Sequence, residues 1–166
     1  EIVTWARDRG LHVVIATNPL FPLTAIEQRM AWGGLGVDRF RYDLVTSYEN
    51  CHATKSSPAY YREILAAIAC PPERCLMVGD NWEWDIVNAA AAGIEGFWIA
   101  PPDAQPGDSG VEPVGQNIAP ENFDDTVDMM DNVATALRGA SCISSSKLRW
   151  GLRQIIDTVA GQEDWA

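Results

Sequence analysis

Short runs of apolar residues recur along the first hundred residues of this chain, separated by stretches with helical periodicity. A run without polar alternation is typical of a strand that is buried on both faces of a parallel sheet. The segments of this kind are Leu11–Ala16, Leu44–Ser47 (shorter than the rest), Cys75–Val78 and Gly96–Ala100. Because helical patterns alternate with these runs, we predict a parallel α/β sheet with flanking helices. One of the helices is expected to begin at Pro58, a residue suited to the first helical position.

The chain changes character after residue 100. Residues 101–121 are rich in proline and glycine and have no periodicity, which indicates a linker or a long surface loop. In residues 122–166, apolar side chains recur at helical spacing on both sides of a polar break at Ser141–Ser146. We therefore expect an α/β core in residues 1–100, then a linker, then a C-terminal helical segment that serves packing.

Composition and charge narrow the class of protein. The chain is 47% hydrophobic and 21% charged, as in ordinary globular proteins. Its net charge of −11 argues against binding nucleic acid or anionic membrane surfaces. No apolar run is long enough to span a bilayer. The four cysteines show no C-x-x-C spacing, so we predict a cytoplasmic protein with reduced thiols and no zinc.

An acidic turn follows the run Cys75–Val78. Asp80 comes just after the carboxyl end of the predicted strand, where open α/β sheets bind ligands, and Asp85 falls in the first turn of the next helix. Two converging carboxylates repel each other unless a cation lies between them, and Mg²⁺ is the natural occupant. The structural alternative is that Asp80 shapes the turn and Asp85 favours the helix N-terminus.

Polar residues also follow or precede other predicted elements. Thr17 and Asn18 come after Leu11–Ala16, where a hydroxyl and a turn N–H could hold phosphate oxygens. Lys55 comes just before the helix at Pro58 and could neutralise a phosphate or a crowded carboxylate. Taken singly, such residues are more commonly an ordinary turn and a solvated surface lysine. Their shared position at strand ends and helix starts predicts one phosphate site.

In this pattern the chain resembles the haloacid dehalogenase-like (HAD) superfamily, and the resemblance covers residues 1 to about 100. Thr17 matches the family's strand-end Thr or Ser, Lys55 its lysine at a helix start, and Asp80 with Asp85 its acidic pair. The resemblance implies a Rossmann-like core and a Mg²⁺-dependent phosphohydrolase acting on a small phosphorylated substrate. It further implies that Thr17 binds the phosphoryl group, that Lys55 balances charge in catalysis, and that the acidic pair holds the metal.

One part of the family pattern is absent from the sequence. The resemblance implies a nucleophile in an Asp-x-Asp motif after a central strand, which would lie between the strands at Leu11–Ala16 and Cys75–Val78. No Asp-x-Asp occurs in the 166 residues. A sheet without its middle strand would leave two rows of main-chain groups unpaired, at about 1–3 kcal/mol each. We therefore expect an inactive C-terminal portion of a longer protein, whose N-terminal segment supplies the nucleophile and a cap.

Two other functions stay open on the sequence. A metal-independent haloacid dehalogenase would share the fold, although Thr17, Asp80 and Asp85 favour a phosphatase. A pseudoenzyme or phosphate-binding module would keep the pocket without the chemistry, and the absence of Asp-x-Asp is compatible with it. The fold alone cannot name the substrate, because function resides in the site.

Overall fold

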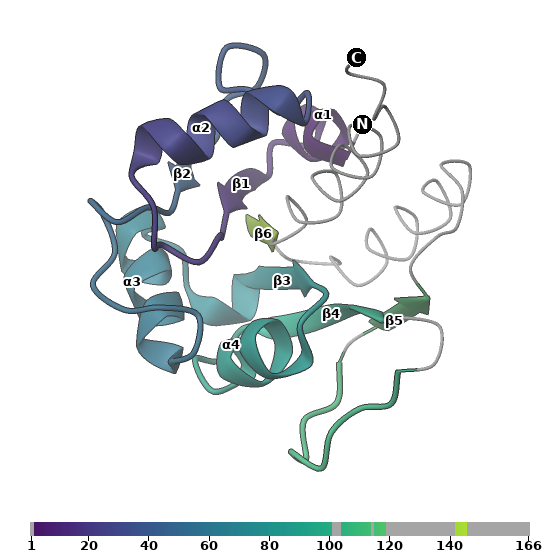
Figure 1. Ribbon diagram of the computed structural model, residues 1–166. Coiled ribbons are helices and arrows are strands. Elements are labelled where there is room, and N and C mark those ends of the chain that lie inside the picture. The colour runs from purple at the N-terminus through teal and green to yellow at the C-terminus, as the bar shows by residue number, and fades with distance from the viewer. Residues whose placement is uncertain (1, 101–103, 114, 119–141, 146–166) are drawn as a thin grey trace, which may run out of the picture.

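The described part of the chain is built around one parallel sheet. The computed structural model describes residues 2–100, 104–113, 115–118 and 142–145. In this part, six strands pair in the order β2-β1-β6-β3-β4-β5, and every pairing is parallel (Figure 1). The strands are β1 (His12–Ile15), β2 (Leu44–Val45), β3 (Cys75–Gly79), β4 (Glu95–Ala100), β5 (Gly115–Ile118) and β6 (Cys142–Ser145).

Helices alternate with the first four strands, which confirms the predicted α/β class. They are α1 (Ile2–Asp8), α2 (Leu23–Trp32), α3 (Pro58–Ile68), the 3₁₀-helix η1 (Pro72–Arg74), the π-helix η2 (Trp82–Val87) and α4 (Asn88–Ala90). Pro58 occupies the first position of α3 as predicted, and the Ser57 side chain accepts a hydrogen bond from the Ala59 amide as its N-cap. Within the described residues, none of these helices has the length and hydrophobicity that crossing a membrane requires.

The central position of the sheet is occupied. We expected no strand of this chain between β1 and β3, and this expectation is wrong, because β6 pairs in parallel with both. Ser145 lies in register with Ile15 on one side and with Val78 on the other. The rows of main-chain donors and acceptors that would otherwise lie unpaired are therefore joined through β6.

The predicted linker and polar break also need correction. Gly115–Ile118, inside the predicted linker at residues 101–121, forms β5 and pairs with β4. Cys142–Ser145, inside the predicted break, forms β6. Strand pairing uses main-chain groups and does not require apolar side chains, so a search for apolar runs misses both segments. The helices expected elsewhere in residues 122–166 lie outside the described residues.

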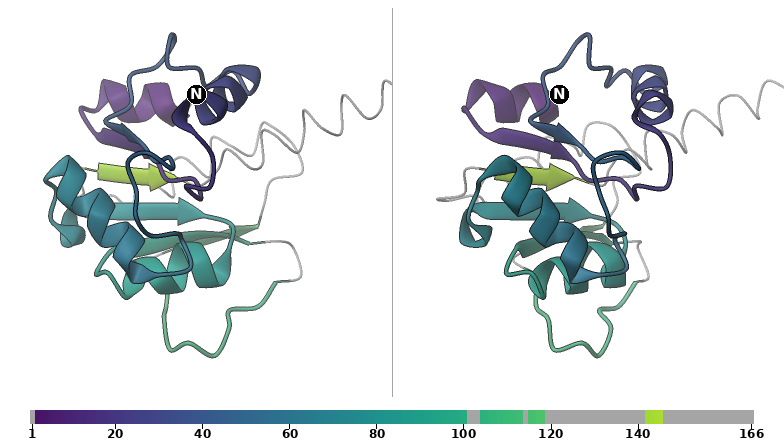
Figure 2. Two further views of the ribbon diagram at one scale, coloured as in Figure 1. Left: turned by 60° about the vertical axis from the view of Figure 1, so that its left-hand side comes forward. Right: turned by 90° about the vertical axis from the view of Figure 1, so that its left-hand side faces the viewer.

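Each face of the sheet is covered by different helices. Along β1, Val13 packs in a cluster with α1, and Ile15 packs with α2. The alternate residues, Val14 and Ala16, pack instead with α3 and with Ala89 of α4. This alternation is the period of a strand buried on both faces. Because the strands run in one direction, their carboxyl ends lie along one edge, to the right in the left-hand view of Figure 2.

Candidate functional site at the carboxyl edge of the sheet

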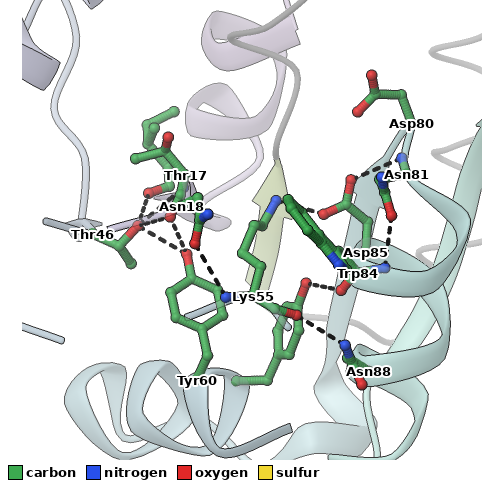
Figure 3. Close-up of polar contacts among 12 residues, drawn as sticks. Thr17, Asn18, Thr46, Lys55, Tyr60, Asp80, Asn81, Trp84, Asp85 and Asn88 are labelled. Atoms are coloured by element: carbon green, nitrogen blue, oxygen red, sulfur yellow. Dashed lines mark hydrogen bonds and ion pairs between the residues drawn. The ribbon is translucent and has the colours of Figure 1, made fainter. Parts of the chain in front are cut away.

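Segments that lie far apart in the sequence meet at this edge (Figure 3). Thr17 and Asn18 follow β1, Lys55 precedes α3, and Asp85 lies in η2 just after β3. The predicted meeting of these residues therefore occurs for Thr17, Asn18, Lys55 and Asp85.

Lys55 and Asp85 form a buried ion pair. Lys55 Nζ lies 2.5 Å from Asp85 Oδ1, and the two residues are only 5% and 1% exposed. The lysine is also fixed through its main chain, because its N–H donates to Asn18 Oδ1 at 3.3 Å and its carbonyl accepts from Asn88 Nδ2 at 2.9 Å. Lys55 is therefore not a solvated surface lysine, which was the alternative interpretation of this residue.

The turn after β3 carries Asp85 back over the strand end. Asp85 Oδ2 accepts a hydrogen bond from the Asn81 amide at 3.1 Å, and the Asp85 amide donates to the Asn81 carbonyl at 2.8 Å. Asn81 also caps η2, since its side-chain oxygen accepts from the Trp84 amide. A Cβ on Gly79 would lie 2.4 Å from the Asp85 carboxylate, so only glycine lets the carboxylate lie this close to β3.

Asp80 is placed differently from Asp85. It is exposed just after β3, and Figure 3 draws its carboxylate above Asp85 with no dashed contact to the Lys55–Asp85 pair. Its carbonyl accepts a hydrogen bond from Trp98 Nε1 at 3.2 Å, which ties this turn to β4. The two carboxylates thus lie in one turn, where Asp85 is paired with Lys55 and Asp80 is exposed.

The donor set for a cation at this edge is small. Among the described residues, no group of three or more His, Cys, Asp or Glu side chains could hold a metal ion. Asp85 already accepts hydrogen bonds from Lys55 and Asn81, which leaves the exposed Asp80 as the accessible carboxylate. Mg²⁺ commonly binds through only one or two carboxylates and keeps several waters, and Asp80 is of the donor type that this ion takes.

The main chain of Thr17 is held by two buried hydroxyls that sequence reasoning missed. The Thr17 amide donates to Thr46 Oγ1 at 3.0 Å, and the Thr17 carbonyl accepts from Tyr60 Oη at 2.7 Å. Thr46 is fully buried just after β2 and also lies 2.9 Å from Tyr60 Oη. Because both main-chain groups of Thr17 have protein partners, its side-chain hydroxyl is the group left for a ligand. A polar Thr at the end of an apolar run was the available signal for Thr46.

Tyr61 contacts the turn that carries Asp85, as Tyr60 contacts the loop that carries Thr17. Its hydroxyl donates to the Trp84 carbonyl at 2.6 Å, one residue before Asp85. Burial raises the pKa of both Tyr60 and Tyr61 above the ordinary tyrosine range, so both hydroxyls stay protonated and can donate. The sequence around Pro58 gave no sign that these hydroxyls would reach the loops of the site.

Comparison with known proteins gives the same family as the motifs. A family model described as a haloacid dehalogenase-like hydrolase matches residues 1–93, which is more than half of the 166 residues. The chain belongs to the haloacid dehalogenase-like hydrolases. This confirms the resemblance on which the motif assignment was based.

Individual relatives and solved structures agree with the family assignment. A phosphoserine phosphatase from Thermus thermophilus is 30% identical over 116 residues, covering 70% of this chain and 41% of that protein. Among solved structures, the HAD hydrolase YfnB from Bacillus subtilis, bound to magnesium, superposes with a TM-score of 0.61 at 20% identity, covering 82% of this chain and 53% of that one. A HAD phosphatase from Thermococcus onnurineus gives a TM-score of 0.60 at 21% identity, with coverages of 84% and 56%.

These similarities differ in what they establish. The two solved structures share the fold of this chain at low identity, which supports a HAD-like core. The chain spans 41–56% of the length of these relatives. The activity of a whole HAD protein therefore enters only as a proposal for this chain.

Proposed function

We propose that this chain forms the phosphate- and metal-binding part of a Mg²⁺-dependent phosphohydrolase that acts on a small phosphorylated substrate. The observation that carries the proposal is the buried Lys55–Asp85 ion pair, tied through Asn18 to the loop that bears Thr17. The phosphoserine phosphatase and the HAD phosphatase among the relatives support phosphate as the ligand, and the magnesium bound to YfnB supports the metal.

In this proposal the site residues have distinct tasks in binding. The Thr17 hydroxyl donates to a phosphate oxygen, and Asn18 fixes the main chain of Lys55, whose ammonium balances the charge of the bound group. Asp80 would hold magnesium, and Asp85, which fixes Lys55, would supply the second carboxylate of the predicted pair. A bound magnesium ion would neutralise negative charge on the phosphate. These residues bind and orient the phosphoryl group.

Hydrolysis by covalent catalysis additionally needs a nucleophile that attacks in line. The sequence contains no Asp-x-Asp, so we expect this chain to bind phosphate without turning over a phosphate ester. The same absence favours the second candidate, a phosphate-binding module without catalysis. A nucleophile supplied by an N-terminal segment remains a prediction, and such a segment would have to reach the site while β6 occupies the place between β1 and β3. Location in the cytoplasm also stays a prediction.

The proposal is tested by titrating the purified chain with inorganic phosphate, with and without Mg²⁺, in a calorimeter. We expect binding that strengthens with Mg²⁺ and weakens by about tenfold in Thr17→Val, since a hydrogen bond to a charged group is lost. Thr54→Val is the matched control, because the Thr54 hydroxyl bonds to Ser56 at an exposed position. Unchanged binding in Thr17→Val, or no binding by the native chain, would contradict the proposed site.

A second measurement separates binding from catalysis. The chain is incubated with p-nitrophenyl phosphate and Mg²⁺, and release of p-nitrophenol is followed. We expect no release above the rate of a no-protein blank. Mg²⁺-dependent release that disappears in Lys55→Gln would show that the chain is itself catalytic and would overturn the expectation of inactivity.

A further inference from the structure

Neighbouring tyrosines at the start of α3 reach two different loops of the site. Tyr60 Oη donates to the Thr17 carbonyl, and Tyr61 Oη donates to the Trp84 carbonyl, beside Asp85. Both side chains are fully buried. Successive residues on a helix point about 100° apart, so adjacent hydroxyls can serve loops that follow different strands.

We propose that Tyr60 and Tyr61 are positioning residues that hold Thr17 and Asp85 in a fixed arrangement around Lys55. The inference rests on the proposed function in so far as the arrangement serves phosphate binding. The hydrogen bonds from the two tyrosines to the site loops are present whether or not a ligand binds. Lys55 lies three residues before the same helix, and its main chain is bonded to Asn18 from one loop and to Asn88 after η2.

The donors and acceptors around Tyr60 show how its hydroxyl helps to hold the Thr17 main chain. Tyr60 donates its single proton to Thr17, and its oxygen is then free to accept from Thr46 Oγ1 at 2.9 Å. Thr46 Oγ1 in turn accepts from the Thr17 amide, and it lies within donating distance of the Thr17 carbonyl at 2.9 Å and of the Ile15 carbonyl at 3.2 Å. Removing the Tyr60 hydroxyl would take one of the two hydroxyl donors from the Thr17 carbonyl. The loop would then open more often, and the Thr17 amide would separate from Thr46 Oγ1 more readily.

The rings are also fixed against each other. Their centroids are 5.0 Å apart at an interplanar angle of 81°, the edge-to-face arrangement that aromatic pairs favour. A tyrosine has few rotatable bonds, so two interlocked rings present their hydroxyls at nearly constant positions. Because burial raises the pKa of both hydroxyls, the two donors keep their protons over the ordinary pH range.

The test is residue-resolved amide hydrogen exchange by NMR on the whole chain, comparing Tyr60→Phe and Tyr61→Phe with the native protein. Tyr60→Phe should speed exchange at the Thr17 amide, and Tyr61→Phe should speed exchange at the Trp84 and Asp85 amides, each by about tenfold and without the reciprocal effect. Tyr42→Phe is the matched control. Its hydroxyl also donates to a main-chain carbonyl, that of Leu35, but in a loop away from the site.

The outcomes distinguish a positioning role from a general structural one. Faster exchange throughout the sheet, or equal effects of both variants at both loops, would overturn the proposal. In the unmodified chain, slowly exchanging hydroxyl protons of Tyr60 and Tyr61 should be visible by NMR. This observation needs no variant to fold, and the absence of both signals would also overturn the proposal.

A second arm connects the arrangement with the ligand. The affinity for inorganic phosphate should fall about tenfold in Tyr60→Phe and stay unchanged in Tyr42→Phe, at temperatures well below the melting point of each protein. Native affinity in Tyr60→Phe would overturn the role in binding. If the native chain binds no phosphate, the proposed function fails, while the exchange pattern still decides whether the tyrosines hold the two loops.

Discussion

Lys55 Nζ lies 2.5 Å from Asp85 Oδ1, and this buried contact joins the start of α3 to the turn after β3. A buried charge pair stabilises a fold only weakly against an apolar replacement, but either charge left alone there is costly. The pair is therefore better explained by what it positions than by what it adds to the free energy of unfolding.

Lys55→Met is expected to destabilise the chain by about 3–5 kcal/mol, because Asp85 would remain buried without its cationic partner. The free energy of unfolding is measured by urea titration. The double variant Lys55→Met/Asp85→Leu is the control, and it should recover at least half of the loss. A loss below about 1 kcal/mol in the single variant would mean that the pair is open to water in solution.

Gly79→Ala is expected to destabilise the chain by about 1–3 kcal/mol, because the new methyl group would overlap the Asp85 carboxylate at 2.4 Å. Gly33→Ala is the matched control, since a Cβ there would meet its nearest atom at 3.5 Å and should change stability by no more than about 0.5 kcal/mol. Urea unfolding measures both. Equal stability of the two variants would show that Asp85 does not lie against β3.

Thr46→Val is expected to lower stability by about 1–3 kcal/mol and to weaken phosphate binding, because the Thr17 amide would lose its acceptor. The two side chains have nearly the same shape, so packing changes little. Thermal unfolding and phosphate titration measure the two effects. Thr54→Val, at an exposed hydroxyl, serves as the control for both. A variant with native stability and native phosphate affinity would show that Thr46 does not hold Thr17 in the site.

Asp43 makes the free energy of unfolding depend on pH in the acid range. Although partial burial opposes it, hydrogen bonds from His12 and the Val13 amide, together with the charge of Arg7, lower the pKa of Asp43 in the fold. The folded protein therefore resists protonation, and this contribution is present above the unfolded pKa of about 4 and is lost as the pH falls through the lower folded value.

Asp43→Asn should accordingly lower the urea midpoint at pH 7 and reduce its further fall between about pH 4 and pH 2. Asp108→Asn, at an exposed carboxylate, is the control and should follow the native curve. An unchanged acid dependence in Asp43→Asn would show that the contacts to Arg7 and His12 do not persist in solution.

Much of the sheet could be predicted from the sequence, because buried strands consist mostly of apolar residues. Strands at the centre of a parallel sheet need apolar side chains on both faces, and β1, β3 and β4 were found from that property alone. β5 and β6 were missed because their places are defined by main-chain pairing with neighbours distant in the sequence. Local residue patterns carry no information about such partners.

The site shows the same division. The sequence by itself determined which groups stand at the strand ends, because Thr17, Lys55 and the acidic residues follow from local order along the chain. The tertiary structure decided how they are arranged: it joined Asp85 to Lys55, left Asp80 exposed, and brought Tyr60 to the Thr17 carbonyl. The physical reason is that a hydrogen bond is fixed by distance and direction in space, whereas the chain records only the kind of residue and its order.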